Sequence, residues 1–252
     1  MSIIATEGGL LSQTQPTVTS FMIAPAERYE VIVDFSMFKE GEEVFIENRL
    51  SQDEGRGPNG TYEEPDILPS GTRLLKFIVG AKPAKADNSL RIPPGVPVPA
   101  GMPLRPFNAI SQAELNQVTT FREFEFERSH GAWVINGQLA GDLSGPIATP
   151  VGDQPEIWRL KNSSGGWWHP IHIHSEFHRV LSRNGGRPAP FEQDGIARKD
   201  TTLLGPGSVV DVYLRFRDYA GPFVFHCHNI AHEDMAMMAR FDILPAPGKT
   251  SL

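Results

Sequence analysis

The chain has 252 residues, of which 40% are hydrophobic, enough for one large domain or two of ordinary size. Its 23 basic and 30 acidic residues give a net charge of -7, and no run of lysine and arginine could follow a nucleic-acid backbone. No stretch approaches the roughly 18 consecutive apolar residues that span a bilayer. We therefore expect neither nucleic acid nor a membrane as a partner.

The distribution of glycine and proline along the sequence is typical of an all-β protein. The 24 glycines and 22 prolines separate short apolar runs and form no repeats. The chain contains a single cysteine, Cys227, so no internal disulfide can form. Cysteine usage therefore leaves the compartment open.

Apolar and polar side chains alternate with period two in several segments. Residues 3–5 are already strand-like with no turn before them, so we expect the chain to begin inside a domain. Residues 29–35, 124–127 and 210–216 alternate clearly, which predicts strands because side chains two apart share one face of a sheet. The best helical signal is at residues 111–115, where a serine and a glutamate have the spacing of a capping box.

A proline-rich stretch divides the sequence. Seven prolines lie between residues 80 and 107, a density that does not suit a sheet interior, so residues 81–117 are predicted to be a linker. Residues 1–80 form a small β unit that is too short for a complete sandwich. Residues 118–252 have the strand spacing of a β-sandwich.

Seven of the eight histidines fall in two short segments, and only His130 stands apart. The clustered histidines are His169, His172, His174 and His178 in the first segment and His226, His228 and His232 in the second. Histidines that only fill hydrogen bonds in a core would be scattered. The clustering therefore predicts metal binding, with structural roles expected for His130 and His178.

The second segment begins as an apolar strand, residues 223–228. In a strand, His226 and His228 point to one face and Cys227 to the other. The same alternation sends His172 and His174 to a common face. One metal ion cannot take all of these ligands, so two metal centres are predicted, joined through the backbone of Cys227.

The candidate partners of Cys227 are His169, His232 and Met237. Two histidines, a thiolate and a weak axial thioether are the ligands of a blue-copper electron-transfer site. A structural zinc site would instead show cysteine pairs or a Cys2His2 grouping. The opposite, imidazole-rich centre suits copper, iron, nickel or zinc equally, so its identity depends on its neighbour. One thioether is enough, so Met235 and Met238 are expected to be packing residues.

The segments HPxHxH (169–174) and HCHxxxHxxxxM (226–237) resemble the third cupredoxin domain of multicopper oxidases. Residues 133–138 and 199–201 are similar to flanks of the bacterial laccase, bilirubin oxidase and phenoxazinone synthase group, and residues 22–35 resemble part of the second domain. The resemblance implies a cupredoxin-like Greek-key β-sandwich, preceded by a partial second cupredoxin-like domain.

The resemblance also implies a role for each ligand. His169, Cys227, His232 and Met237 would bind type 1 copper, which takes single electrons from a small phenolic or similar reducing substrate. His172 would bind type 2 copper, and His174, His226 and His228 would bind the type 3 pair where dioxygen becomes water. Glu233 would deliver protons. An extracytoplasmic location is suggested by the resemblance alone.

One departure from the family pattern limits this function. The family's three-copper cluster uses eight histidines, four of them from two HxH pairs in an N-terminal domain, and this chain has no histidine before residue 130. An N-terminal cupredoxin domain or another chain would have to complete the cluster. Two hypotheses follow: part of a laccase-like oxidase, or a copper-binding electron-transfer module without oxygen chemistry. Bilirubin, phenols, aminophenols and metal ions all remain open as substrates.

Overall fold

The computed structural model describes residues 1–85, 98–139 and 145–249. These ranges contain fourteen strands and two short helices, α1 (Gln112–Leu115) and α2 (Ile230–Asp234). The prediction of an all-β chain is confirmed. Neither helix in the described ranges is long and apolar enough to cross a bilayer.

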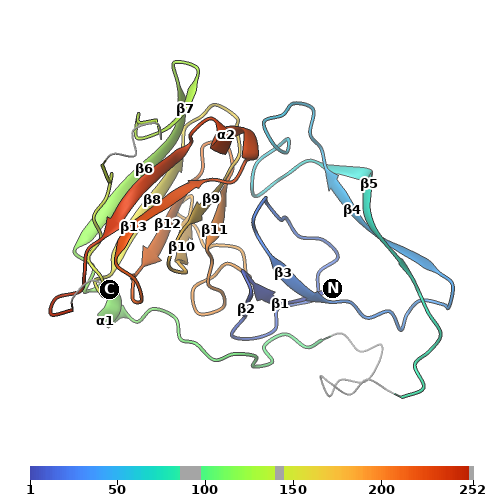
Figure 1. Ribbon diagram of the computed structural model, residues 1–252. Coiled ribbons are helices and arrows are strands. Elements are labelled where there is room, and N and C mark those ends of the chain that lie inside the picture. Colours follow the sequence, from blue (N-terminus) through green and yellow to red (C-terminus); the bar gives the residue numbers. More distant parts are fainter. Residues whose placement is uncertain (86–97, 140–144, 250–252) are drawn as a thin grey trace.

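The C-terminal half is a sandwich of two sheets (Figure 1). The first sheet has the order β10-β12-β8-β6-β7, and its strands are β6 (Thr120–Ser129), β7 (Ala132–Ile135), β8 (Glu156–Asn162), β10 (Arg179–Arg183) and β12 (Val209–Leu214). The second has the order β11-β9-β13-β14, and its strands are β9 (His169–Ile173), β11 (Thr201–Leu204), β13 (Gly221–Cys227) and β14 (Met238–Ile243). Strands adjacent in each sheet are often distant in sequence.

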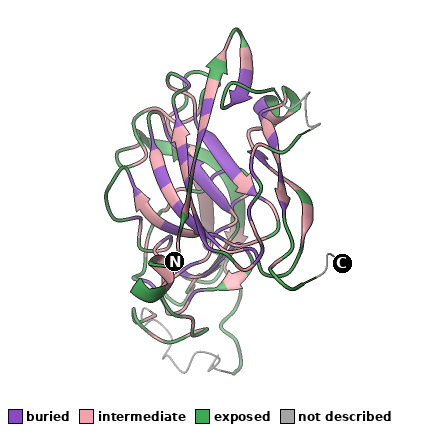
Figure 2. Ribbon diagram, turned by 90° about the vertical axis from the view of Figure 1, so that its left-hand side faces the viewer, coloured by how far each residue is buried: buried purple, intermediate pink, exposed green. Residues whose placement is uncertain are grey.

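Aromatic side chains from both sheets meet in the core of the sandwich. Phe124 on β6 contacts Phe225 on β13, with ring centroids 4.7 Å apart, and Trp158 on β8 meets Phe241 on β14 edge-on at 5.4 Å. Burial of each such side chain contributes roughly 1.5–3 kcal/mol. Buried residues, purple in Figure 2, accordingly concentrate in the strands of the sandwich.

The N-terminal part forms two small sheets. Strands β1 (Ser2–Thr6), β2 (Gly9–Leu10) and β3 (Tyr29–Ile32) pair in the order β2-β1-β3, while β4 (Glu43–Leu50) pairs with β5 (Ile67–Ile78). The strand predicted at residues 29–35 is therefore shorter than expected, because β3 ends at Ile32. Apolar residues remain exposed along β5, among them Leu74 and Ile78, which are 64% and 65% exposed.

The proline-rich stretch falls partly on residues 86–97, which lie outside the described residues. Its described part runs beside the N-terminal segment: Thr14 donates its N–H to the carbonyl of Met102 at 2.8 Å, and Leu104 donates to Ser12 at 3.0 Å. The predicted helix at residues 111–115 is confirmed as α1, and Ser111 and Glu114 form the expected capping box. The division into domains at residues 80 and 118 stays a prediction.

Buried ion pairs join the N-terminal part to the sandwich. The ammonium of Lys199 is fully buried and contacts the carboxylates of Glu7 and Glu27, which belong to the N-terminal part. A buried lysine of this kind is tolerated only when its charge is paired. The two parts are thus in direct contact at Lys199, two residues before strand β11 begins.

Candidate metal centre

The pairing of β9 with β13 brings the two histidine segments together. The strands are antiparallel neighbours, with His226 opposite His172 and Cys227 opposite Ile171. Because alternate side chains point to opposite faces, His226 and Cys227 turn away from each other. Two separate groups of ligand side chains result.

The thiolate group, as we call it, consists of His169, Cys227 and His232. Their ligand atoms all lie within 4.8 Å of one another, and all three residues are buried. The Sγ of Cys227 is 3.4 Å from Nδ1 of His169 and 3.7 Å from Nδ1 of His232. Asn229 caps helix α2, and the helix places His232 close to Cys227 at the end of β13. These three side chains converge as the sequence predicts.

The backbone places Met237 against the thiolate group. Cys227 donates its N–H to the carbonyl of Met237 at 3.0 Å, and Met237 donates to the carbonyl of His232 at 2.9 Å. Met237 is completely buried in the same core cluster as Cys227. Met235 and Met238 are the two methionines expected to pack and not to bind metal. Met235 follows α2 and is 61% exposed, so it packs little, whereas Met238 on β14 is half-buried.

Burial sets the protonation of the thiolate group. It lowers the pKa of His169 to about 3, with a further contribution from His232, and it lowers the pKa of His232 to about 4. Both imidazoles are therefore neutral, which is the form that binds metals. Burial also raises the pKa of the Cys227 thiol to about 12, so this proton has to be displaced by the metal itself.

Further side chains, which sequence reasoning missed, orient these ligands. Ser164 Oγ is 2.7 Å from Nε2 of His169, which leaves Nδ1 facing Cys227. The indole of Trp133 lies on the His232 ring, with centroids 3.8 Å apart, and Trp167 meets the same ring edge-on at 5.1 Å. Trp133 belongs to residues 133–138, which are similar to flanking segments of the family. No sequence pattern indicates a role for Ser164. Such supporting contacts hold a ligand in place before a metal binds.

The imidazole group consists of His172, His174, His226 and His228. Their ring centroids are 4.7 to 5.7 Å apart in five pairs, and Nε2 of His174 lies 3.2 Å from Nε2 of His226. The predicted convergence of four histidines is therefore present. Burial lowers the pKa of His226 to about 4 and, with the neighbouring imidazoles, lowers the pKa values of His174 and His228. These three imidazoles therefore favour the neutral form, which is the form that binds metals.

The imidazole group is wider than the thiolate group. In the described part of the chain, the thiolate group alone has three His, Cys, Asp or Glu ligand atoms close enough for a single ion. His172 is oriented by the backbone carbonyl of Asp200, 3.0 Å from its Nδ1. Because a carbonyl can only accept, Nδ1 carries the proton and Nε2 is left as the ligand atom.

The remaining candidates lie beside these groups. His178 is buried and its Nε2 is 2.7 Å from Thr202 Oγ1, while His130 is exposed in a turn and contacts Ser129. Neither belongs to a ligand group. Glu233 is half-buried in α2, and its charge acts on both Cys227 and His228.

The donor atoms of the thiolate group suit copper. A thiolate, two imidazoles and a neighbouring thioether are soft or borderline ligands, which favour copper over magnesium, calcium or manganese. A structural zinc site would be closed by four strong ligands, and the only cysteine of the chain is already in the group. The residues present therefore fit a copper ion of the type 1 kind.

Comparison with known proteins agrees with this geometry. A family model described as multicopper oxidase matches residues 109–247. The chain is 34% identical over 252 residues to bilirubin oxidase from Albifimbria verrucaria, covering 97% of this chain and 40% of that protein. It is 29% identical to a laccase from Bacillus subtilis, covering 95% of this chain and 45% of that protein. This chain thus spans less than half of each relative.

Solved structures show the same fold. The laccase of Pediococcus acidilactici superimposes with a TM-score of 0.69 at 26% identity, covering 96% of this chain and 44% of that one. McoA, a multicopper oxidase from Aquifex aeolicus, superimposes with a TM-score of 0.72 at 21% identity, covering 96% and 49%. The predicted cupredoxin-like fold and copper as cofactor are confirmed. This chain belongs to the multicopper oxidase family.

Proposed function

We propose that this chain is the C-terminal part of a laccase-like oxidase. Electrons from a small phenolic or similar reducing substrate enter at the thiolate group and leave through Cys227 towards the imidazole group. One observation carries the proposal: His226 and Cys227 are consecutive residues of β13 and belong to different ligand groups. The shortest covalent path between the groups is therefore a single peptide unit.

The ligand assignment follows the two groups. His169, Cys227 and His232 would hold type 1 copper, with the thioether of Met237 as a further, weak donor. His172 holds type 2 copper, and His174, His226 and His228 contribute to the type 3 pair. When bound, copper would supply one-electron redox chemistry at the thiolate group and, at the imidazole group, the four-electron reduction of dioxygen to two water molecules.

Three neighbouring side chains cover and orient the ligands of the thiolate group. Trp133 and Trp167 cover His232 and exclude water from the thiolate group. Ser164 fixes the orientation of His169 before any metal binds. Preformed, dry ligand sets of this kind hold their geometry when the charge of the metal changes.

Protons for dioxygen reduction come from Glu233 in this proposal. Its carboxylate is half-buried one residue after the ligand His232 and interacts electrostatically with His228 in the other group. A proton donor has to lie within hydrogen-bond reach of the reacting oxygen, directly or through one water. The electrostatic effect of Glu233 on both Cys227 and His228 supports its choice as the donor.

The imidazole group needs ligands from elsewhere. An N-terminal cupredoxin domain or a second chain carrying two HxH pairs supplies the other four histidines, and dioxygen is the second substrate. A copper module used only for electron transfer is not favoured, because it would have no use for four converging histidines beside the thiolate group.

Copper analysis and visible absorption of the pure chain test the proposal. We expect strong visible absorption from copper bound to the Cys227 thiolate, lost in Cys227→Ser and in His169→Gln. His130→Gln is the matched control, because His130 is exposed and outside both groups. A copper-loaded chain without this absorption, or one whose colour survives Cys227→Ser, would show that the thiolate group is not a type 1 site.

A further inference from the structure

A second polar site lies outside both ligand groups. A cavity of about 260 Å³ is lined by Arg179, Arg215, Arg217 and Tyr213, with Glu114 as the one carboxylate among its lining residues. We call it the arginine cavity. Its walls come from the start of β10, the end of β12 and the residues that follow it, and from α1 and the chain segment before it.

The alternation of side chains along β12, continued in the three residues that follow it, explains why the charges gather there. Val212, Leu214 and Phe216 point into the core and are at most 1% exposed. Tyr213, Arg215 and Arg217 occupy the intervening positions and therefore share the opposite face. Arg179 is paired directly with Tyr213 across the sheet, which brings the third guanidinium to the same face.

The acidic partners leave much of this positive charge unused. Arg179 is held by Asp194 at 2.9 Å, but Arg217 reaches Glu176 only at 3.3 Å. Arg215 reaches Glu114 only at 3.9 Å, beyond hydrogen-bond distance. Arg217 also donates to the carbonyl of Arg215 at 3.2 Å, and Arg179 to that of Asn108 at 3.5 Å. Each guanidinium has five N–H donors, so these few contacts leave several donors available.

Further arginines surround the cavity. Burial, together with the neighbouring Arg105 and Arg179, lowers the pKa of Arg198, which stacks on Phe107 and Phe177. Burial and Arg217 likewise lower the pKa of Arg179, although Asp194 opposes them. Like charges are therefore crowded at this face, which creates a positive potential that favours an anion.

Two buried atoms at the cavity are unsatisfied. Among the described residues, Tyr213 Oη and Arg215 Nε make no hydrogen bond of good geometry, although Tyr213 is only 3% exposed; the Arg215 side chain lies close enough to the Tyr213 hydroxyl to interact with it. A buried donor without a good hydrogen bond destabilises the fold. Both atoms are donors, and an oxygen-bearing anion in the cavity would satisfy them.

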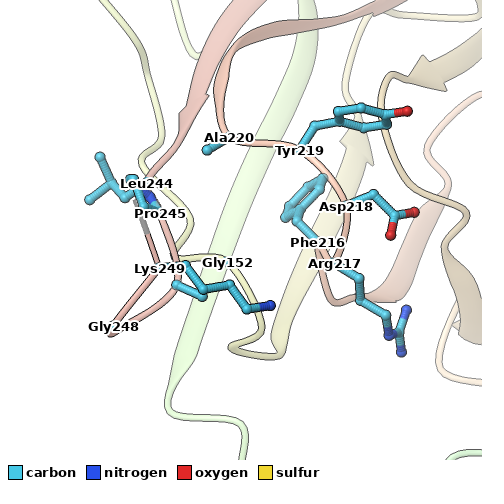
Figure 3. A pocket seen from close by; sticks show the side chains of 11 residues that line it. Gly152, Phe216, Arg217, Asp218, Tyr219, Ala220, Leu244, Pro245, Gly248 and Lys249 are labelled. Atoms are coloured by element: carbon cyan, nitrogen blue, oxygen red, sulfur yellow. The ribbon is translucent and has the colours of Figure 1, made fainter. Parts of the chain in front are cut away.

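A larger cavity nearby provides a contrast. It has about 390 Å³ and is lined by residues 216–220 and the segment 244–249 (Figure 3). Its lysine, Lys249, is already paired with Asp153 at 2.7 Å, and it contains one arginine, Arg217. This cavity does not concentrate positive charge, and the arginine cavity does.

We infer that the arginine cavity binds a small multivalent oxyanion, such as inorganic phosphate or a polycarboxylate. The oxygen atoms of the anion accept hydrogen bonds from Tyr213 Oη, from Arg215 Nε and from the guanidinium N–H groups of Arg179 and Arg217. Planar guanidinium groups bind such oxygen atoms in pairs. This site is independent of the proposed oxidase function.

Calorimetric titration of the full chain with phosphate, sulfate and citrate, with and without copper, tests the inference. We expect saturable one-site binding that weakens at high salt, with the three anions competing for the same site. Arg215→Gln should weaken binding about ten-fold or more. Arg73→Gln, which makes the same charge change on β5, should leave it unchanged.

Tyr213→Phe separates binding from folding. Because its hydroxyl makes no hydrogen bond of good geometry, the ligand-free variant should be about as stable as the wild type, yet the thermal shift produced by phosphate should decrease. Binding that does not saturate at millimolar anion, or that is equal in all four proteins, overturns the inference. The anion that binds most tightly identifies whether phosphate or a carboxylate is the natural ligand class.

Discussion

Arg28 donates two hydrogen bonds, 2.9 Å and 2.6 Å long, to the carboxylate of Asp200. This contact connects the N-terminal part of the chain to the residue that lies next to the imidazole group. The backbone carbonyl of the same aspartate accepts the Nδ1 proton of His172. Burial raises the pKa of Asp200, but hydrogen bonds from His172, Arg28 and Thr201 outweigh it and hold this pKa well below its usual range. Asp200 is therefore a fixed anion beside His172, which we propose as a metal ligand.

Replacing Arg28 tests this connection. Arg28→Gln removes the paired hydrogen bonds, and since Arg28 is 47% exposed we expect the free energy of unfolding to fall by only about 1 kcal/mol. Visible absorption of copper at the thiolate group should not change, because Arg28 contacts none of its ligands. Urea denaturation and absorption spectra check both outcomes, with Arg73→Gln as control. Loss of the visible absorption in Arg28→Gln would contradict the separation of the two groups.

Met237→Leu tests the axial ligand. Met237 is fully buried, and leucine conserves its volume, so the loss of stability should stay below about 1.5 kcal/mol. Removing a weak thioether donor disfavours Cu(II) more than Cu(I), so the reduction potential should rise while the colour is retained. A redox titration followed by visible absorption measures this shift. If the potential falls instead, Met237 is not the axial ligand.

His178 predicts a pH dependence of stability. Burial, with a contribution from the charge of Lys199, lowers its pKa from 6.5 to about 3 in the folded chain. The neutral ring is favoured on folding, so this stability is complete above about pH 6.5 and is lost as the pH falls towards 3. Each such group contributes a slope of about 1.4 kcal/mol per pH unit within that window.

The measurement is urea denaturation of the copper-free chain at about pH 6 and pH 4.5, for the wild type and His178→Gln. The pKa values of His169, His226 and His232 are lowered as well. The free energy of unfolding of the variant should therefore still fall with decreasing pH, but less steeply than that of the wild type. His130→Gln, at an exposed turn, should leave the slope intact. An identical pH dependence in wild type and His178→Gln would show that His178 does not titrate on unfolding.

Much of the metal centre could be predicted from local sequence. The division of His226 and Cys227 between two groups follows from the period of a strand alone, because adjacent side chains point to opposite faces. The capping box of α1 also depends only on residues three positions apart. Side-chain directions and capping contacts that depend only on residues close in sequence can therefore be predicted before the fold is known.

The supporting contacts could not be predicted in this way. Lys199 would be expected at the surface, and its burial is explained only by Glu7 and Glu27, more than 170 residues earlier in the chain. The stacking of Trp133 on His232 likewise depends on how β7 and α2 meet. Such partners become visible only when the sheets have been assembled, because no spacing rule connects them.

Glu233→Gln tests proton delivery. The experiment needs a complete enzyme, in which this chain is joined to a domain supplying the other histidines. The variant should slow dioxygen reduction and leave the visible absorption unchanged, because Glu233 acts after the electron has entered. Asp234→Asn is the matched control, since Asp234 is the exposed neighbour in the same helix. Turnover equal to that of the wild type would remove the role of Glu233.

The four histidines of the imidazole group are too few for a three-copper cluster. Unit charges 4 Å apart in a partly buried site repel by about 4 kcal/mol, and the repulsion between divalent ions is about four times larger. The resemblance to the family implies eight imidazoles to offset it, and this chain provides His172, His174, His226 and His228. We therefore expect the pure chain to hold copper tightly only at the thiolate group.

Self-association cannot repair the imidazole group, because the spare histidines are unsuitable. His178 is buried against Thr202, and His130 is a single residue in an exposed turn. Metal analysis after gel filtration, with oxygen uptake on a phenolic donor, should show colour without rapid dioxygen reduction. Adding a separately expressed N-terminal domain with two HxH pairs should restore both full copper loading and activity. A pure chain that retains four coppers and reduces dioxygen rapidly would mean that the cluster is completed in another way.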